Sequence, residues 1–537
     1  MKNIKLLDCT LRDGGRIINC AFSDNEIAKL SEGLESAHID IVEVGFLRDW
    51  RNVNYVGNST FFTDVNQISH VIRHKDSNTL YVAFIDYGMF DFDSLKQHDG
   101  TSIDGIRFGF TKKDYLEHYN DLIKCMHLIK QHGYKLLIQG VNSLNYSDKE
   151  LLQLVDLINK ENPYSFGIVD TYGAMYIEDI DRIYNLINNN LNSNIFLDFH
   201  SHNNYQMSFA LAQEFVKLSR GKRKIIIDGT LYGMGKVAGN LNLELIAEYL
   251  IKKLNYNYDL DILLDLIDNY ITNYLIQNRW GYSIAGLMSG EYKAHPNNVI
   301  YLLEKFRIDS KDIGNILAKI SPDVRQRYDY DNIKKIYIEY MSNKVDDTKT
   351  IALLKEKFAA KDVLILVPGA SLKDKKQEID DFISKNEIMI VSVNFVSKYE
   401  KAYSFIANQK RFNQIKEPKK NIILSSNIEH ECDAYVVNYQ SIINLDSKYF
   451  DNSTIMLLNL FRKIMPKKIY IAGFDGFFVG KKNFFNETLE NSRNQKDYED
   501  VNRETKRMFS AIRNSIVDTC PIEFLTESIF DIIPEEI

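Results

Sequence analysis

Two histidines two positions apart, His200 and His202, stand at the end of the apolar run that begins at Ile195. If this run is a β-strand, alternate side chains point to one face, so the two imidazole rings lie side by side. Two imidazoles on one face form half of a transition-metal site. An isolated pair of this kind is more often a pair of buried histidines without a metal, but its place at the end of a strand favours the metal site.

A carboxylate and a cation follow the first apolar run of the chain, Ile4–Asp8. Asp13 offers a hard oxygen ligand, and Arg12 places a fixed positive charge beside it. Gly14 and Gly15 let the backbone pass close to a bound molecule. The alternative interpretation is an Arg–Asp ion pair that only caps the strand.

A glycine-rich segment, Gly233–Asn240, follows the last apolar run of the first half. Asn240 can present an amide oxygen to a cation. The alternatives are a plain loop and a phosphate-binding turn at the start of a helix.

Eight short apolar runs recur at intervals of roughly thirty residues, with amphipathic stretches between them, as βα units require. They are Ile4–Asp8, Ile39–Gly45, Leu80–Ile85, Gly105–Gly109, Lys135–Gln139, Ser165–Asp170, Ile195–His200 and Lys224–Asp228. Three of the helices predicted between them are Asp24–Ala37, Tyr115–His132 and Asp148–Lys160, the last with Ser147 as its N-cap. Eight such units predict a (β/α)8 TIM barrel, with an open doubly wound sheet as the alternative. Polar residues at the carboxyl ends of the runs favour the barrel, because barrel active sites are built there.

In a closed barrel the eighth strand lies between the seventh and the first, so the three motifs are neighbours in space. Asp13, His200, His202 and Asn240 then form a mixed nitrogen and oxygen set that suits a divalent metal. We expect manganese, with cobalt, zinc or magnesium as alternatives. A metal with open positions beside Arg12 is suited to enolate chemistry.

The three motifs resemble those of the metallolyase TIM barrels. They are Thr10-Leu-Arg-Asp-Gly14, the HxHN sequence from His200 to Asn203, and the GxGxxAGN sequence from Gly233 to Asn240. This family includes 4-hydroxy-2-oxovalerate aldolase, 3-hydroxy-3-methylglutaryl-CoA lyase and isopropylmalate synthase, and the resemblance covers about residues 1–300. It implies that Asp13, His200 and His202 bind the metal, with Asn240 as an optional ligand, and that Arg12 holds the enolate oxygen.

The resemblance also places Glu43 and Thr171 on the wall of the site, where either residue could equally be structural. The aldolase branch, which the chain resembles most, carries a histidine where this chain has Arg16. A guanidinium there suits a substrate carboxylate or phosphate. The acyl-CoA lyase branch carries a cysteine in the strand-eight loop, and residues 228–240 contain none.

Neither branch therefore identifies the acid or base of the reaction. The candidates for proton transfer are Tyr282, which resembles a tyrosine of the aldolase branch, and His295. A structural role is the alternative for each.

The length of 537 residues predicts more than one domain. We predict a barrel over residues 1–260, a helical extension over 261–345, a linker over 346–360 and a Rossmann-like α/β domain over 361–537. Gly369 and Ser371 after one strand of that last domain, and Asp475 after another, are candidates for binding a nucleotide or nucleotide sugar. These turns weakly resemble the Rossmann-like domains of bacterial sialyltransferases and archaeal hydroxymethylpterin pyrophosphokinases, and ordinary turns are the alternative.

The composition excludes several classes of protein. A net charge of −7, from 66 basic and 73 acidic residues, argues against a nucleic-acid binder. The five cysteines form no CxxC pair, which fits a reducing cytoplasm. We find no signal-peptide core at the N-terminus and no apolar run long enough to span a membrane, so we expect a cytoplasmic enzyme, and we expect it to form a homo-oligomer.

Three hypotheses for function follow. The first is an aldolase that forms or cleaves a 4-hydroxy-2-oxo acid from a 2-oxo acid and an aldehyde, in the synthesis of an unusual sugar or a surface polysaccharide. The second is a Claisen-type acyl-CoA condensing transferase on the same metal. The third is a non-catalytic barrel that supports a C-terminal transferase domain.

Overall fold

The computed structural model describes residues 3–72, 78–305, 308, 310–327, 329–343, 345–415, 421–489 and 495–531. The chain forms two compact units. The barrel unit comprises residues 1–300 and 321–328, and the second unit comprises residues 301–320 and 329–537.

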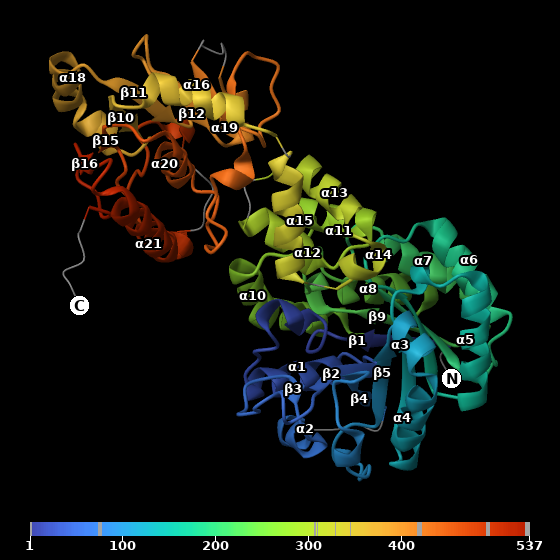
Figure 1. The fold of residues 1–537 in the computed structure, drawn as a ribbon. Helices are drawn as coiled ribbons and strands as arrows, with labels where there is room; N and C mark the ends of the chain where they lie inside the picture. The colour runs from blue at the N-terminus through green and yellow to red at the C-terminus, as the bar shows by residue number, and fades with distance from the viewer. Residues whose placement is uncertain are drawn as a thin grey trace. The chain divides into compact units, whose positions relative to one another are not determined.

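Within the described residues of the barrel unit, eight parallel strands close into a barrel, which confirms the predicted fold (Figure 1). Closure is direct, because β1 pairs on one side with β9 and on the other with β2. A short strand, β3 (Phe61–Phe62), extends β2 outside the ring. The barrel strands are β1 (Ile4–Asp8), β2 (Ile41–Leu47), β4 (Leu80–Asp86), β5 (Gly105–Phe110), β6 (Lys135–Gly140), β7 (Ser165–Asp170), β8 (Phe196–Ser201) and β9 (Ile225–Gly229).

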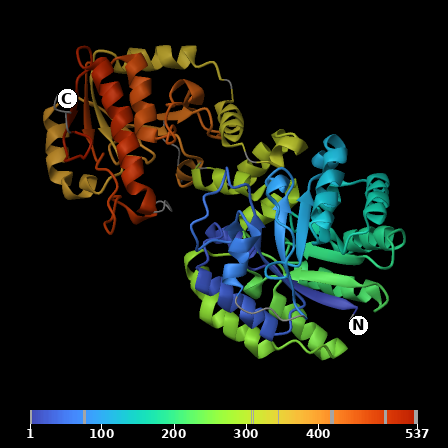
Figure 2. The same ribbon diagram turned by 90° about the horizontal axis from the view of Figure 1, so that it is seen from below.

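Amphipathic helices cover the outside of the strands, and both ribbon views show them there (Figures 1 and 2). Ser147 caps α5 as predicted, accepting a hydrogen bond from the Glu150 amide while Glu150 bonds back to the cap. The predicted helix Tyr115–His132 is instead divided at His118, whose backbone leaves the helical region. The helices are α1 (Asp24–Ser36), α2 (Val65–Val71), α3 (Lys112–Glu117), α4 (Tyr119–Gln131), α5 (Asp148–Glu161), α6 (Ile177–Asn188), α7 (Ser208–Ser219) and α8 (Leu243–Leu254).

The interior of the barrel is built in layers. One apolar layer contains Leu7, Ile41, Val82, Leu137 and Ile226. Residues two positions further along a strand face the same way, and three of them are the buried polar residues Glu43, Gln139 and Asp228. A polar layer therefore lies directly between the apolar layer and the carboxyl ends of the strands.

Further helices follow the barrel. They are α9 (Leu260–Leu266), a π-helical turn (Ile267–Ile271), α10 (Thr272–Gln277), α11 (Ile284–Tyr292), α12 (Pro296–Lys305), α13 (Ser310–Lys319), α14 (Pro322–Arg325) and α15 (Tyr330–Ser342). These helices are divided between the two units rather than forming one extension of the barrel. The boundary between the two units falls within α12, because the second unit begins at Tyr301. The second unit contains α13 and α15, whereas α14 belongs to the barrel unit.

Within residues 346–360, where a linker or linking helix is predicted, α16 (Thr348–Phe358) occupies most of the segment. Phe358 is fully buried, with its ring 4.8 Å from that of Tyr403 and 5.5 Å from that of Phe461. This helix is part of the core of the second unit.

Parallel strands form the sheet of the second unit, in the order β14-β13-β12-β11-β10-β15-β16 among the described residues. The strands are β10 (Asp362–Leu366), β11 (Met389–Val393), β12 (Tyr403–Ile406), β13 (Ile422–Ser425), β14 (Tyr435–Val437), β15 (Lys468–Ala472) and β16 (Ile522–Phe524). The order reverses between β10 and β15. In open α/β sheets, ligands bind beyond the carboxyl ends of the strands at such a reversal.

Helices cover both faces of this sheet. The helix α18 (Lys376–Lys385) packs on one face, where Phe382 contacts Tyr470 at 4.9 Å. On the other face lie α16, α20 (Ser453–Ile464) and α21 (Tyr498–Ile516). Short helices α17 (Ser371–Asp374) and α19 (Gln409–Asn413) follow β10 and β12. Among the described residues, no helix is both long enough and apolar enough to cross a membrane.

We predict that Phe358→Ala destabilises the second unit by about 3–5 kcal/mol, because the substitution leaves a cavity between α16 and α20. Urea denaturation followed by far-UV circular dichroism measures this free energy of unfolding. Leu353→Ala on the same helix is the control, since Leu353 is 48% exposed and its removal should cost under about 1 kcal/mol. Equal effects of the two substitutions would show that α16 is only a connecting segment.

Candidate metal centre and its surroundings

Asp13, His200 and His202 come together at the carboxyl ends of β1 and β8. Their ligand atoms all lie within 4.8 Å of one another. His202 Nε2 is 3.7 Å from Asp13 Oδ2. Asp13 and His200 are buried, while the side chain of His202 keeps 21% exposure. The closed barrel thus joins residues that are almost two hundred positions apart in the sequence.

Arginines hold one oxygen of Asp13 and leave the other for a ligand. Oδ1 accepts a hydrogen bond from Arg12 Nη1 at 2.5 Å and lies 3.2 Å from Arg16 Nε. Oδ2 faces His202. Burial by itself would raise the pKa of Asp13, but the charge of Arg12 and the nearby histidines and Arg16 bring it well below its usual value. The carboxylate is therefore ionised, as a metal ligand must be.

The rings of His200 and His202 are also in the state that a metal requires. His200 Nδ1 lies 3.0 Å from Asp228 Oδ2, so that contact orients the ring and directs Nε2 away from Asp228. Burial lowers the pKa of both histidines to about 4, so both rings are neutral near pH 7.

Asn240 completes the fit to a metal. Its Nδ2 donates to the Met234 carbonyl at 2.9 Å, while its buried Oδ1 has no hydrogen-bond partner among the described residues. A backbone bridge joins Asn240 to His202. Two neutral imidazoles, an ionised carboxylate and an unpartnered amide oxygen form a suitable donor set for a divalent cation of the first transition series.

A second cluster, formed by Cys9, His200 and Asp228, is less suitable for a metal. Burial raises the pKa of the Cys9 thiol well above its usual value, so the thiol keeps its proton. The Cys9 Sγ–H donates to the Gly229 carbonyl at 3.4 Å, and Asp228 is already bonded to Arg107.

A fully buried cation, Arg107 in β5, lies in the polar layer beneath these ligands. It donates to Asp228 at 2.5 Å, to Glu43 at 3.1 Å and to Asp198 at 3.1 Å. Burial raises the pKa of Asp198 to about 7. Arg107, Asp198 and Asp228 are not among the residues predicted from the sequence, although a charged residue in each of three apolar runs is a visible signal.

Arg12 is held rigidly beside the metal ligands. Its Nε donates to Glu43 Oε2 at 2.6 Å, and its guanidinium lies 4.6 Å from the ring of Phe84. Gly109 makes room for that ring, because a Cβ atom there would lie 2.4 Å from it. Only 4% of Arg12 is exposed.

The other predicted wall residues differ in their surroundings. Glu43 is fully buried and joins Arg12 to Arg107, which makes it a positioning residue. The Thr171 hydroxyl, just after β7, is buried without a hydrogen-bond partner in the described part of the chain.

The two predicted proton-transfer residues are not brought into this cluster. Tyr282 is 62% exposed. His295 Nδ1 accepts a hydrogen bond from the Asn297 amide at 3.2 Å. Burial, and then the charges of Lys236 and Arg16, lower the pKa of His295 to about 4. Neither Tyr282 nor His295 belongs to the group of Asp13, His200 and His202 that could hold a metal ion among the described residues.

Comparison with known proteins shows the family to which the barrel belongs. Residues 3–269 match the HMGL-like family. The barrel of this chain belongs to that family. Its members are divalent-metal-dependent aldolases, lyases and transferases.

Two relatives and one solved structure illustrate the range of similarity. The chain is 26% identical over 275 residues to a 4-hydroxy-2-oxovalerate aldolase of Pseudoalteromonas translucida (strain TAC 125), covering 50% of this chain and 76% of that protein. It is 23% identical over 398 residues to a 2-isopropylmalate synthase of Lactococcus lactis subsp. lactis (strain IL1403), covering 71% of this chain and 72% of that protein. The N-terminal domain of a putative aldolase from Bacteroides vulgatus is 23% identical, with a TM-score of 0.46, covering 56% of this chain and 96% of that structure.

In the second unit, Gly369, Ser371 and Asp475 meet where the strand order reverses. Ser371 donates through its backbone amide to Asp475 Oδ2 at 2.9 Å and through its hydroxyl to Oδ1 at 2.5 Å. A Cβ atom on Gly369 would lie 2.3 Å from the Gly473 carbonyl. The two predicted turns therefore pack against each other, and the Asp475 carboxylate is occupied by Ser371.

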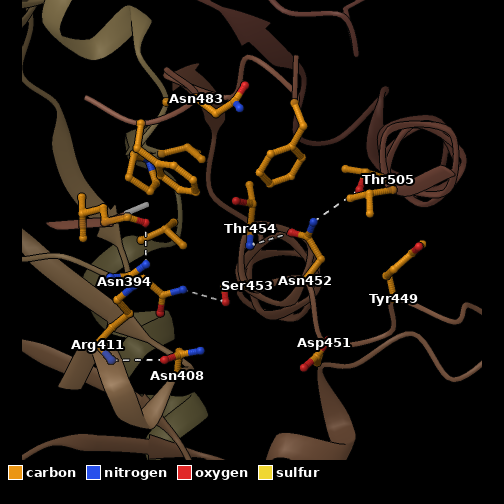
Figure 3. Close-up of a pocket in the computed structure, with 18 of the residues that line it drawn as sticks. Asn394, Asn408, Arg411, Tyr449, Asp451, Asn452, Ser453, Thr454, Asn483 and Thr505 are labelled. Atoms are coloured by element: carbon orange, nitrogen blue, oxygen red, sulfur yellow. Dashed lines mark hydrogen bonds between the residues drawn. The ribbon is translucent and has the colours of Figure 1, made fainter. Parts of the chain in front are cut away.

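A cavity of about 970 Å³ opens beside these turns, and Figure 3 shows its polar wall. Asn394 donates to the Ser453 hydroxyl at 2.8 Å, and Asn452 caps the start of α20 by accepting from the Thr454 amide. Thr454 is only 4% exposed, and its backbone amide is 3.1 Å from Asn452 Oδ1. Aromatic side chains line another part of the cavity: Tyr449, Phe474, Phe477, Phe484 and Phe530.

We predict that Asp13→Asn abolishes tight Mn²⁺ binding, because it removes the only carboxylate of the Asp13–His200–His202 cluster. Asp228→Asn should weaken binding by about 10–100-fold, since Asp228 orients His200 but is not one of the Asp13–His200–His202 ligands. Electron paramagnetic resonance of free Mn²⁺ measures both affinities. Cys9→Ser is the control and should leave the affinity unchanged. A larger loss in Cys9→Ser than in Asp13→Asn would transfer the site to the second cluster.

Proposed function

We propose that the barrel is a divalent-metal-dependent aldolase that forms or cleaves a 4-hydroxy-2-oxo acid through the enolate of pyruvate. The observation that carries this proposal is the cluster of Asp13, His200 and His202 with the guanidinium of Arg12 fixed beside it. Membership of the HMGL-like family and the similarity to 4-hydroxy-2-oxovalerate aldolases support it.

A divalent cation, with manganese as our first choice, would supply Lewis-acid catalysis at Asp13, His200 and His202, with Asn240 as a further ligand. Arg12 would stabilise the negative charge that develops on the carbonyl oxygen of the 2-oxo acid. Glu43 and Phe84 already hold this guanidinium in place, so little reorganisation is needed when the charge appears. The unpartnered Thr171 hydroxyl would donate to the substrate carboxylate.

Proton transfer to and from the aldehyde oxygen needs a further group. We favour His295 over Tyr282, because His295 lies within electrostatic reach of Arg16 and its lowered pKa leaves a neutral ring near pH 7. The largely exposed Tyr282 has less to hold it in a reactive position.

The second candidate is a Claisen-type condensation of an acyl-CoA with a 2-oxo acid, which the isopropylmalate synthase relatives favour. The two reactions differ in a product: only condensation releases free coenzyme A. A non-catalytic barrel is the third candidate, and complete failure to retain a divalent metal would favour it.

For the second unit we propose that the cavity binds a nucleotide or a nucleotide sugar. The aromatic part of the wall suits a base, and the hydroxyl of Thr454, which lines the cavity at the N-terminus of the twelve-residue helix α20, suits a phosphate. Gly369, Ser371 and Asp475 would shape this site rather than bind the phosphate, since the Asp475 carboxylate repels an anion. A sugar-nucleotide ligand would agree with a role in unusual-sugar or surface-polysaccharide synthesis.

We predict that the protein with Mn²⁺ exchanges the methyl protons of pyruvate for deuterium in D₂O, because enolate formation needs no aldehyde. Loss of the methyl proton signal in NMR, after the metal is stripped, measures the rate. His200→Ala and metal-free protein should be inactive, whereas His127→Ala on the outer helix α4 should not differ from wild type.

Absence of exchange in protein shown to hold Mn²⁺ would reject the pyruvate enolate. Release of free coenzyme A that depends on a 2-oxo acid would then establish the condensation in its place.

We predict that at least one of CMP, UMP, AMP and GMP binds the full-length chain with a dissociation constant below about 1 mM. Isothermal titration calorimetry measures this constant. Thr454→Val should weaken binding by about tenfold, because a hydrogen bond to a charged phosphate is lost. Thr519→Val, on an exposed turn after α21, is the matched control. No binding of any of the four nucleotides at 5 mM would contradict this proposal.

A further inference from the structure

Two arginines share one aromatic ring at the mouth of the barrel. Arg16 follows β1, and Arg48 directly follows β2. Their guanidinium carbons lie 4.7 Å and 4.3 Å from the centre of the Phe46 ring. Arg16 keeps 38% side-chain exposure and Arg48 keeps 13%, so the pair lies at the border between the buried site and solvent.

These two cations have too few carboxylates for their charge. Asp86, at the end of β4, lies 2.7 Å from Arg48 Nη2 and 3.9 Å from Arg16 Nη2. In the part of the chain that the structure describes, the one other carboxylate paired with either arginine is Asp13. Asp13 also belongs to the candidate metal centre and already accepts from Arg12. Asp86 is therefore shared by two guanidinium groups, and about one positive charge is left over.

One donor of the pair is also unused. Arg48 Nη1 is buried and has no hydrogen-bond partner among the described residues. Stacking on Phe46 stabilises the flat face of a guanidinium but leaves the N–H groups at its edge unbonded. A buried, charged donor without an acceptor is unfavourable. A purely structural role, in which Arg48 only stacks on Phe46, therefore does not account for its unbonded N–H group.

We propose that Arg16 and Arg48 form an anion subsite that binds a carboxylate or phosphate group on the aldehyde partner of the reaction. This inference rests on the proposed aldolase function, and it names the class of aldehyde. Guanidinium groups bind planar and tetrahedral oxyanions through paired N–H donors, which an ammonium cannot do.

The position of the subsite limits the size of the aldehyde. Arg16 contacts Asp13 directly, so an anion on the pair lies close to the metal centre. The charged group is therefore only a few bonds from the aldehyde carbon, as in a short phosphorylated or carboxylated aldehyde. Arg12 is separately engaged by Glu43 and Asp13 and remains for the 2-oxo acid.

The test compares D-glyceraldehyde 3-phosphate with D-glyceraldehyde, because the two aldehydes differ only in the phosphate. Glyoxylate provides the carboxylate arm. The Mn²⁺-loaded, full-length protein is given pyruvate with each aldehyde, and kcat/KM is measured. We expect at least one anionic aldehyde to exceed D-glyceraldehyde by about 10–100-fold, and the better of the two identifies the preferred anion.

Substitutions then assign this preference to the arginine pair. Arg16→Gln and Arg48→Gln should each remove most of the preference, and Arg48→Gln should leave kcat/KM for D-glyceraldehyde within about threefold. Because Arg16 also contacts the proposed metal ligand Asp13, Arg16→Gln is judged only by the ratio of kcat/KM for the anionic aldehyde to kcat/KM for D-glyceraldehyde. Arg48→Lys should restore only part of it, because the charge returns without the paired donors. Arg51→Gln is the matched control, since Arg51 lies on the same loop but is bonded to Asp49 with 57% of its side chain exposed.

Three further measurements separate this inference from the proposed function. Deuterium exchange into pyruvate tests the enolate without any aldehyde, so exchange without a preference for anionic aldehydes would overturn the subsite alone. Equal loss with all aldehydes, through a higher KM for pyruvate in Arg16→Gln and Arg48→Gln, would assign the pair to the 2-oxo acid instead. If the enzyme proves inactive, calorimetric titration of the protein with inorganic phosphate tests the subsite directly. Phosphate binding that is weakened by Arg48→Gln but not by Arg51→Gln supports the subsite. Phosphate binding that Arg48→Gln leaves unchanged rejects it.

Discussion

The ion pairs of the buried Arg107 are the interactions on which both His200 and Arg12 depend for their positions. Arg107 is a permanent positive charge inside a closed barrel, and such a charge is tolerated only when it is paired on several sides. Arg107 is paired on two sides. On one side it donates to Asp228, which in turn contacts His200 and orients the imidazole ring. On the other side it donates to Glu43, which in turn contacts Arg12 and holds the guanidinium beside Asp13. One buried cation thus positions a proposed metal ligand and the proposed oxyanion-binding group together.

The apolar layer beneath this network explains how the barrel tolerates it. Leu7, Ile41, Leu137 and Ile226 pack across the interior, and the polar residues follow two positions later on the same strands. Water is therefore excluded from below, while on the other side of the layer the side chains of His202 and Arg16 keep 21% and 38% exposure. The low dielectric constant strengthens each ion pair in the layer and would also strengthen the proposed effect of Arg12 on a developing negative charge.

The second unit is also built from parallel βα units, but they form an open sheet and not a closed barrel. Its sheet stays open, and its strand order reverses between β10 and β15, so the loops after these strands diverge and border a cavity. The chain therefore combines a closed barrel, with its polar centre at one end, and an open sheet with a separate cavity. Each unit offers its own candidate binding site.

The parts of this description that depend on local pattern were predictable from the sequence. The eight apolar runs, the Ser147 cap and the three motifs after the first, seventh and eighth strands are visible because strand alternation and helix capping act over a few residues. The same local rules could not assign α16 to a core, because only the burial of Phe358 shows that the helix belongs to one. They also missed the break at His118 in the predicted helix Tyr115–His132.

Only the tertiary structure could decide how the residues are used. Arg107, Asp198 and Asp228 come from three strands, and their pairing follows from barrel closure, which no short stretch of sequence specifies. The same holds for Arg16 and Arg48, which meet on Phe46 only after β1 and β2 pair. The sequence by itself determined which side chains are present, where the strands lie and which family the barrel resembles. The tertiary structure decided which charges are neutralised and which donors remain unpaired, because charge pairing depends on distances between residues that are far apart along the chain.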